Sequence, residues 1–370
     1  MAAYFSIVTP VYNGREYLDQ AYESLKKQSF QDWEWILVND ASKDDSESWM
    51  LEKKEEDPRI KVISFEENRG AGKAREEGVK LAQGSYLCFL DVDDKIDLDL
   101  LENLYEVLLN HPAQVTVFGV TEEYLRDGKL TKTKVILPEF QGKNVGDYSV
   151  GEDGATSFEA KFIQKQEEVR KELILLEKRT LYGYLWNKCY HRAYLQSVGA
   201  VFPDHVLLED AAYNLLVFEE VASMNLLGYA PYHYQKKQGK NLTAGFYPDY
   251  FFVHKNHVKD LLRQQERFGL ANDATKTSLA DILVRYICSA LERNCHKEAK
   301  MSHKDRKAWV EALYKDPVFL ELFPYATRNQ NLSILVDGLD GHRTWLCLFV
   351  GRVAYVVKTH FAGLFEKLRS

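Results

Sequence analysis

Short apolar runs alternate with amphipathic segments along about the first 120 residues of the chain. The amphipathic segments show helical periodicity near 15–31, 43–56 and 71–83. Apolar runs without polar alternation are typical of parallel strands buried on both faces, and helices between them are typical of βαβ crossovers. We therefore expect an α/β fold with a parallel sheet covered by helices on both faces. The runs are Phe5–Val8, Trp35–Val38, Lys61–Phe65 and Ser85–Leu90, followed by Gln114–Val120.

A loop rich in polar side chains follows each of the first four strands. Ligands of open parallel sheets bind beyond the carboxyl ends of the strands, so these loops are expected to meet at one edge. After the fourth run, Asp91, Asp93 and Asp94 fall within four positions. An Asp-x-Asp pair can hold a hard divalent cation, which can bridge nucleotide phosphates. The alternative is that acids here only open the next helix, because Asp favours N-caps.

The rest of the chain is less regular. A polar segment with several glycines runs from Thr121 to about Thr180 and contains a charged helical pattern near 158–178. Loops of this length are usually lids or mobile segments, so we interpret it as an insertion. Residues 181–245 would complete the first domain, 1–245. Residues 246–370 are expected to form a mostly helical C-terminal region with segments near 250–268, 276–294, 304–315 and 343–368.

Composition fits a globular protein with more than one domain. The 370 residues are 45% hydrophobic and 28% charged, which is enough for a large core. The net charge of -7 argues against a nucleic-acid partner, since such proteins present a basic surface. The five cysteines are odd in number and scattered, which favours a reducing, cytoplasmic setting.

The sequence predicts no membrane-spanning segment. Met1–Ala3 leads directly into a core strand, and the longest apolar stretch, Trp345–Val357, contains Arg352 and falls short of the ~20 residues that a spanning helix needs. The tail Arg343–Arg369 mixes apolar and basic residues. A basic amphipathic helix can lie on an anionic membrane surface, here the inner face of the plasma membrane. Packing on the protein's own core or on a second subunit explains the pattern equally well, so peripheral membrane contact and a homo-oligomer both stay open.

Several motifs together resemble family 2 glycosyltransferases with the GT-A fold. The acceptor half of that family and its closing segment are also matched, so the resemblance covers roughly two thirds of the chain. It implies an inverting, metal-dependent enzyme that uses Mn²⁺ or Mg²⁺. The sugar would move from a nucleotide-diphosphate donor, UDP-linked by family tendency, to a glycan or lipid-linked acceptor in cell-surface polysaccharide synthesis. The motifs are Ser6–Gly14, Val38–Asp44, Asn68–Gly70 with Arg75, Leu90–Asp94, Leu185–Tyr190, Leu208–Asp210 and His233–Lys237.

The resemblance assigns donor-side roles to residues in the first 120 positions. Asp93 would be the principal metal ligand, and Asp91 would contact the ribose or share the metal, with Asp94 in support. Asp40 would contact the base or ribose. In the same way, Thr9, Pro10 and Tyr12 would contact the base from the first loop, and Arg75 would lie near the nucleotide. Glu76 stands where the family often has Asn, which departs from the pattern.

The resemblance also assigns acceptor-side roles. Asp210 would be the catalytic base, with Glu209 beside it; the alternative is an acid pair favoured by a helix N-terminus. Trp186 would line the acceptor pocket or pack in the core, and Asn187 and Lys188 would contact the acceptor. Lys236, with His233, would approach the donor diphosphate as a mobile clamp.

Two other classes of protein stay open as alternatives. One is a nucleotidyltransferase, which would be expected to carry a basic, Gly-rich loop after its first strand, where this chain has Thr9–Asn13. The other is a noncatalytic glycan-binding or scaffold protein on the same fold. Gly70–Ala74 lacks the earlier Gly and the Ser/Thr of a P-loop. No Gly-x-Gly-x-x-Gly motif follows the first strand, so a dinucleotide-binding domain is not expected.

Overall fold

The computed structural model divides the chain into two compact units, Met1–Lys240 and Asn241–Ser370. The domain boundary expected at residue 245 lies outside the described residues. The structure describes residues 3–126, 128–140, 143–144, 149–150, 156–203, 207–237, 246–328 and 332–360.

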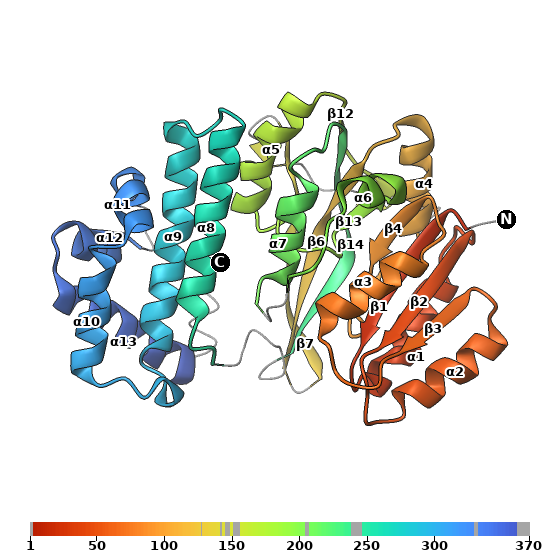
Figure 1. The fold of residues 1–370 in the computed structure, drawn as a ribbon, viewed down its shortest axis with the longest axis horizontal. Helices are drawn as coiled ribbons and strands as arrows, with labels where there is room; N and C mark the ends of the chain where they lie inside the picture. The colour runs from red at the N-terminus through yellow and green to blue at the C-terminus, as the bar shows by residue number, and fades with distance from the viewer. Residues whose placement is uncertain are drawn as a thin grey trace. The chain divides into compact units, whose positions relative to one another are not determined.

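A mixed sheet of ten strands within the described residues forms the first unit (Figure 1). Its first four strands are parallel, in the order β3-β2-β1-β4, which confirms the α/β class predicted for this half. The strands are β1 (Phe5–Val11), β2 (Trp33–Asn39), β3 (Ile60–Ser64), β4 (Tyr86–Phe89), β5 (Lys95–Ile96), β6 (Val115–Arg126), β7 (Lys129–Ile136), β12 (Ala160–Ile163), β13 (Lys188–His191) and β14 (Met224–Lys237).

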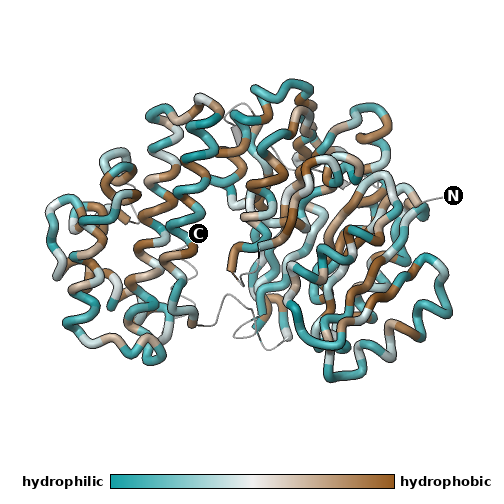
Figure 2. The backbone as a smooth tube through the Cα atoms, in the orientation of Figure 1, coloured by the Kyte–Doolittle hydropathy of each residue, from teal (hydrophilic) through white to brown (hydrophobic). Residues whose placement is uncertain are grey.

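Helices cover the sheet because its strands are apolar on both faces. Every residue of β2 is buried. Tyr22 of α1 stacks on Trp35 on one face, whereas Gly78 of α3 approaches Val8 and Val38 on the other. In Figure 2 the strands are hydrophobic over continuous stretches, whereas hydrophobic and hydrophilic residues alternate along the helices. The helices are α1 (Arg15–Lys26), α2 (Ser46–Glu56), α3 (Ala71–Leu81), α4 (Leu100–Asn110), α5 (Gln166–Lys178), α6 (Arg192–Val198) and α7 (Glu209–Val217).

The strand order creates a switch point between β1 and β4. The chain runs outward from β1 through β2 to β3, and then returns to place β4 on the other side of β1. In open α/β sheets, ligands bind at such a point, beyond the carboxyl ends of the strands. The segments after β1 and β4, which hold Tyr12 and Asp91, flank this position.

Strand structure extends farther along the chain than the sequence pattern indicated. β6 continues through residues expected to begin an insertion, and pairs with β7 in an antiparallel hairpin. β14 runs parallel to β6, with a register shift between Leu227 and Tyr232. Much of the expected insertion is therefore strand, and short pairs complete the part that is described: β8 (Glu139–Phe140) with β9 (Lys143–Asn144), and β10 (Ser149–Val150) with β11 (Thr156–Ser157).

The second unit is helical, as predicted. α9 is its centre, because buried residues occupy most of its turns and both α8 and α13 pack against it. Two short helices, α11 and α12, were not predicted. The elements are α8 (Tyr250–Arg267), α9 (Asp273–Arg293), η2 (Lys297–Ala299), α10 (His303–Leu313), α11 (Pro317–Leu322), η3 (Phe323–Tyr325), α12 (Ser333–Asp340) and α13 (Thr344–His360).

The amphipathic tail is α13 over most of its described length. Its inner side approaches α9, since a Cβ on Gly351 would lie 2.8 Å from Leu291 Cβ. Trp345 and Phe349 are 68% and 58% exposed. Among the described residues, no helix is long and apolar enough to span a bilayer. Contact of this tail with a membrane surface or a second subunit stays a prediction.

Replacing Gly78 by Ala is expected to destabilise the first unit. The new Cβ would lie 2.4 Å from Val8 Cγ1, a fully buried atom in the sheet. Overpacking of this kind costs about 1–3 kcal/mol of unfolding free energy. Chemical denaturation measures the change. Gly183→Ala is the matched control, because its added Cβ meets nothing closer than 3.4 Å. An equal effect of the two substitutions would contradict the close packing of α3 on β1.

Candidate active site

A buried arginine joins two acidic groups that are far apart in the sequence. Arg75 Nη2 donates to Asp91 Oδ1 at 2.7 Å, just beyond β4. Arg75 Nη1 donates to Asp210 Oδ1 at 2.9 Å and lies 3.7 Å from Glu209 Oε1, both in the first turn of α7. The Arg75 side chain is only 6% exposed. The residue expected near a nucleotide therefore also connects the two halves of the predicted site.

Small residues and a buried carboxylate place Arg75. Gly72 and Gly78 allow α3 to approach Phe202 and Val8 closely. Asp40 accepts the N–H groups of Arg69 at 2.6 Å and Gly70 at 2.9 Å, and so fixes the turn that enters α3. Gly70 has a φ of +86°, a conformation that side chains rarely adopt. Asp40 therefore holds the loop before α3; its contact with a base or ribose stays a prediction.

Both acids in the first turn of α7, Glu209 and Asp210, have raised pKa values. Removal from solvent raises the pKa of Asp210 to about 7. The Arg75 charge lowers this pKa, whereas the charges of Glu209 and Asp91 raise it further. The same loss of solvent raises the pKa of Glu209. The Asp210 side chain is still 21% exposed. A carboxylate with these properties can accept a proton near neutral pH, which is what a general base requires.

The three carboxylates after β4 divide into a buried and an accessible part. Asp94 is fully buried and accepts Tyr232 Oη–H and Gln235 N–H, each at 2.8 Å. Asp93 is 37% exposed and lies 3.3 Å from Lys237 Nζ. Burial, with the Asp91 charge, raises the pKa of Asp93 despite Lys237. Negative charge is thus in excess here, and carboxylate oxygens are the ligands that hard divalent cations prefer.

This excess makes Asp93 and Asp91 suitable for a divalent cation. Within the described residues, however, no three or more His, Cys, Asp or Glu side chains converge as a ready-made metal site. A cation would therefore take only part of its ligands from the protein. Donor phosphates and water would supply the rest, as is usual for Mg²⁺ with nucleotides.

The first-loop residues are less uniform than expected. Thr9 and Pro10 lie within β1, not in a loop, and Thr9 is buried with its hydroxyl accepting Trp35 Nε1–H at 2.8 Å. Direct contact of the Thr9 side chain with a base is therefore wrong for this structure. Tyr12 lies beyond the strand and is 53% exposed.

An open depression of about 750 Å³ lies at the end of β3. It lies at the polar loop that follows the third strand, whose residues carry no catalytic motif in the sequence. The volume suits a ligand of nucleotide size, which typically needs about 300–1,000 Å³. Its lining is Ser64, Phe65, Glu66, Glu67 and Arg69.

The three predicted acceptor contacts lie in the interior. Trp186 is 3% exposed, and Asn187 and Lys188 are fully buried. Lys188 Nζ donates to the carbonyls of Leu181 and Tyr184 and to Asn187 Oδ1. Burial lowers the pKa of Lys188 well below its usual value. Direct contact with an acceptor is therefore wrong for these side chains, because their polar groups are already used inside the fold.

Asn214 completes this buried network and was not identified from the sequence. Its Nδ2 donates to the carbonyls of Tyr182, Gly183 and Tyr184 at 3.0, 2.9 and 3.1 Å. Tyr190 Oη–H donates to Asn214 Oδ1 at 2.8 Å. Because Asn214 lies one helical turn after Asp210, the network fixes the loop 181–184 relative to the acid pair. Only its place four residues after an acid could have signalled it.

The predicted clamp residues are part of the sheet. His233 and Lys236 lie in β14, and His233 contacts Glu123 and Asp97 at 2.8 Å through its two ring nitrogens. Lys236 pairs with Glu122. These residues are thus held in a strand, and contact of Lys236 with the donor diphosphate stays a prediction. The next residue, Lys237, is the lysine that reaches Asp93.

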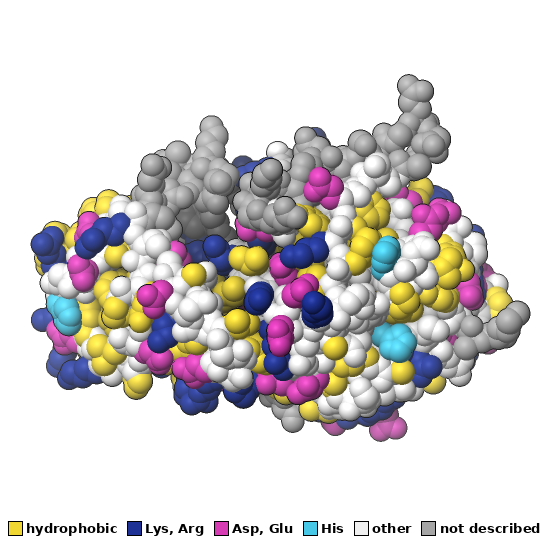
Figure 3. Space-filling model, turned by 90° about the horizontal axis from the view of Figure 1, so that it is seen from above, with side chains coloured by type: hydrophobic (Ala, Val, Ile, Leu, Met, Phe, Trp, Pro, Cys, Tyr) yellow, Lys and Arg dark blue, Asp and Glu magenta, His cyan; other side chains and the backbone are white. Residues whose placement is uncertain are grey.

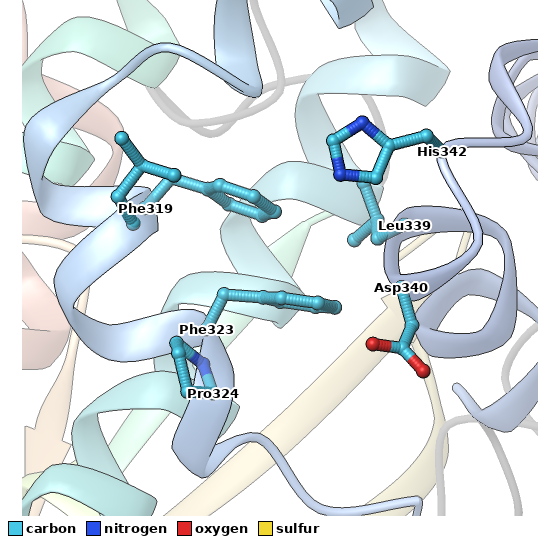
Figure 4. A pocket seen from close by; sticks show the side chains of 7 residues that line it. Phe319, Phe323, Pro324, Leu339, Asp340 and His342 are labelled. Carbon is cyan, nitrogen blue, oxygen red and sulfur yellow. The ribbon is translucent and has the colours of Figure 1, made fainter.

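The second unit holds a smaller cavity, shown in Figure 4. Phe319 and Phe323 stack there at 4.6 Å, and their side chains point toward Leu339 and His342. The cavity volume is about 120 Å³, which is too small for a nucleotide sugar. On the face in Figure 3, Lys and Arg are mixed with Asp and Glu, unlike a nucleic-acid surface.

Comparison with known proteins agrees with this fold. Residues 6–158 match the model of the family Glycosyl transferase family 2. This range includes Arg75, Asp91 and Asp93. This part of the chain is therefore similar to family 2 of the glycosyltransferases, the family that its motifs resemble.

Several bacterial glycosyltransferases are similar to this chain. It is 38% identical over 114 residues to the putative teichuronic acid biosynthesis glycosyltransferase TuaG of Bacillus subtilis, covering 31% of this chain and 45% of TuaG. It is 23% identical over 357 residues to the uncharacterized glycosyltransferase EpsJ of B. subtilis, covering 96% of this chain and 95% of EpsJ. The crystal structure of S. aureus TarS 1-349 in complex with UDP-GlcNAc covers 95% of this chain and 91% of its own, at 20% identity and a TM-score of 0.63. That likeness shows the shared fold.

Asp210→Asn is expected to stabilise the protein at about pH 8. The folded-state pKa of about 7 exceeds the ordinary 3.8, so the folded protein holds the proton between these values and loses stability as pH rises through them. The advantage of Asn should disappear near pH 4. Thermal unfolding across this range measures it.

Asp57→Asn is the matched control. Arg59 lowers the pKa of Asp57, so its charge stabilises the fold and its removal should lower stability at the alkaline end. A loss of stability in Asp210→Asn at high pH, equal to that in Asp57→Asn, would contradict the raised pKa.

Proposed function

We propose that this protein is an inverting glycosyltransferase that moves a sugar from a UDP-linked donor to a hydroxyl of a cell-surface glycan precursor. The observation that carries the proposal is the single guanidinium of Arg75, which contacts both Asp91 and Asp210. Arg75 thus connects Asp91, on the donor side, with Asp210, whose carboxylate can act as a base. The depression at the end of β3 supports a base-binding site on the donor side.

Asp93 and Asp91 would hold Mn²⁺ or Mg²⁺ together with the donor phosphates. When bound, the cation neutralises the charge that grows on the departing diphosphate. The support is the excess of carboxylate over cationic charge around Asp93. Lys237, 3.3 Å from Asp93, lies where its charge also offsets that of the leaving group. Tyr12 and the depression lined by Phe65 and Arg69 would contact the nucleoside.

Asp210 is the proposed base. Its carboxylate takes the proton from the acceptor hydroxyl as that oxygen bonds to the anomeric carbon and the bond to the diphosphate breaks. Displacement from the side opposite the leaving group inverts the configuration, so an α-linked donor gives a β-linked product. Arg75 holds Asp210 in place, and Glu209 keeps the local charge negative enough to favour proton uptake.

The acceptor is proposed to be a glycan or lipid-linked saccharide of the bacterial envelope, handled at the inner face of the plasma membrane. Supporting this, TuaG and TarS carry names from teichuronic acid and poly(ribitol-phosphate) synthesis. The transferred sugar would be a hexose or N-acetylhexosamine.

A panel of UDP-, GDP- and dTDP-sugars tests the proposal, with Mn²⁺, Mg²⁺ or EDTA. We expect metal-dependent binding and slow hydrolysis of one donor class. Asp93→Ala should lose donor binding, because the cation loses its principal ligand. Asp210→Asn should keep donor binding while transfer falls at least about 100-fold, as is typical of a lost general base. Calorimetry and product release measure these effects. If the folded wild-type protein binds no nucleotide sugar with metal, the enzymatic proposal is wrong and the noncatalytic alternative gains.

The rate of transfer is expected to rise with pH and level off above about pH 7, because Asp210 must be ionised to accept a proton. Initial rates at saturating donor measure this profile. Arg75→Gln should move the midpoint upward, since the Arg75 charge lowers the Asp210 pKa. Arg75→Lys keeps a cation and should move it less. A flat profile, or a downward shift in Arg75→Gln, would remove Asp210 from the role of base.

A further inference from the structure

Four aromatic side chains form a continuous cluster beside the acid site. Trp186 stacks on Tyr184 at 4.3 Å and on Tyr232 at 4.4 Å, and its ring lies 5.3 Å from that of Tyr234. Tyr232 donates to Asp94, so the cluster begins directly behind the carboxylates. The charges of Asp91, Asp93 and Asp94 also act on the phenol of Tyr234.

Only the outer members of this cluster are accessible. Trp186 and Tyr232 are 3% and 1% exposed, whereas Tyr184 and Tyr234 are half-buried. The backbone of Tyr184 is held by Asn214 and Lys188. The rings of Tyr184 and Tyr234, whose centroids are 6.1 Å apart, are therefore supported by the buried rings of Trp186 and Tyr232.

Lysines continue this row along the extended strands. Lys236 lies over the rings of both Tyr234, at 5.4 Å, and Tyr124, at 5.2 Å. Lys132 also lies over the ring of Tyr124, at 5.8 Å. The strand register pairs Tyr124 with Lys132 and Lys236, and Glu122 with Lys134 and Tyr234, so these residues share one face of the sheet.

The charge of these strands is opposite to that of the chain. β6, β7 and β14 together contain six lysines and arginines and two glutamates, although the chain as a whole carries a net charge of -7. Glu122 on the same face pairs with Lys236 and accepts Tyr124 Oη–H at 2.8 Å. Among the described residues, no carboxylate forms an ion pair with Lys132 or Lys134. The charge of Lys134 acts on Glu122 across the strands and Lys132 lies over the Tyr124 ring, but no close ion pair holds either ammonium group in the part of the chain that the structure describes.

We propose that Tyr184, Tyr234, Tyr124, Lys236, Lys132 and Lys134 form an acceptor track that binds an anionic polysaccharide or polyol-phosphate chain and leads it to Asp210. Resting on the proposed function, this assigns the acceptor class. Tyrosine rings can pack against the apolar faces of sugar rings, and ammonium groups can pair with the carboxylates or phosphates between them. An uncharged glycan has no anionic groups with which the lysines could pair. The track also replaces Trp186 as the aromatic contact expected from the sequence.

Binding of three short oligomers of equal length tests the track by calorimetry, on the full chain and without donor. The probes are β-1,4-oligoglucuronate, its uncharged counterpart β-1,4-oligoglucose, and oligo(glycerol phosphate). We expect at least one anionic probe to bind more tightly than oligoglucose, with an affinity that falls as salt is added. The first two probes differ only in the carboxylate, and the third separates phosphate from carboxylate recognition.

Matched variants locate the binding. Lys132→Gln with Lys134→Gln should weaken binding of the preferred anionic probe about fivefold or more, the range expected for two exposed ion pairs. Lys54→Gln, an exposed lysine on α2, should change nothing. Tyr184→Leu should weaken oligoglucuronate but leave oligo(glycerol phosphate) unchanged, because the latter has no ring to stack. Far-ultraviolet circular dichroism verifies folding of each variant.

Unchanged anionic binding in the double lysine variant, or oligoglucose bound as tightly as the anionic probes, would overturn the proposal. Binding of UDP-sugars by the same proteins is measured in parallel. If the wild-type protein binds a UDP-sugar but none of the anionic oligomers, the acceptor assignment alone is rejected. If the wild-type protein binds no UDP-sugar, the proposed function is rejected.

Discussion

The site depends on one buried guanidinium. Arg75 is shared by Asp91, beyond a strand end, and by Glu209 and Asp210, at the start of a helix. Burying a cation is costly unless carboxylates surround it, and these carboxylates would repel one another without the cation. Each group therefore requires the others. The same requirement explains the small residues of α3, because any larger side chain at Gly72 or Gly78 would move Arg75 away from the sheet.

The environment separates the acids into different chemical roles. Asp94 is enclosed and bonded to Tyr232 and Gln235, so it shapes β14 around the site. Asp93 is more exposed and lacks sufficient positive charge, which suits a cation. Asp210 has a pKa near neutrality, which suits proton transfer. Pairs of carboxylates whose surroundings push their pKa values apart are a general means of assigning acid, base and metal roles within one site.

A buried polar network supports the loop 181–184, and its side chains hydrogen-bond to groups within the fold. Lys188 and Asn214 bind the carbonyls of the loop 181–184, which turns this irregular segment into a rigid support. Residues that resemble acceptor contacts in the sequence thus hold the backbone of Tyr184, which in the proposed track forms the surface together with Tyr234. The extension of β6 and β14 beyond the core then adds a row of lysines to that surface.

The sequence by itself determined the four parallel strands, the positions of α1 to α3, the helical second unit and the acids that form the candidate site. These follow from local periodicity and from short motifs, because continuous apolar runs specify buried strands and clustered acids rarely occur without a ligand or partner. Only the tertiary structure decided the length of β6 and β14, the burial of Thr9, Asn187 and Lys188, and the meeting of Arg75 with Asp210, 135 positions apart. Those features depend on contacts between distant segments, and a polar side chain looks the same in sequence whether it faces water, a ligand or a buried carbonyl.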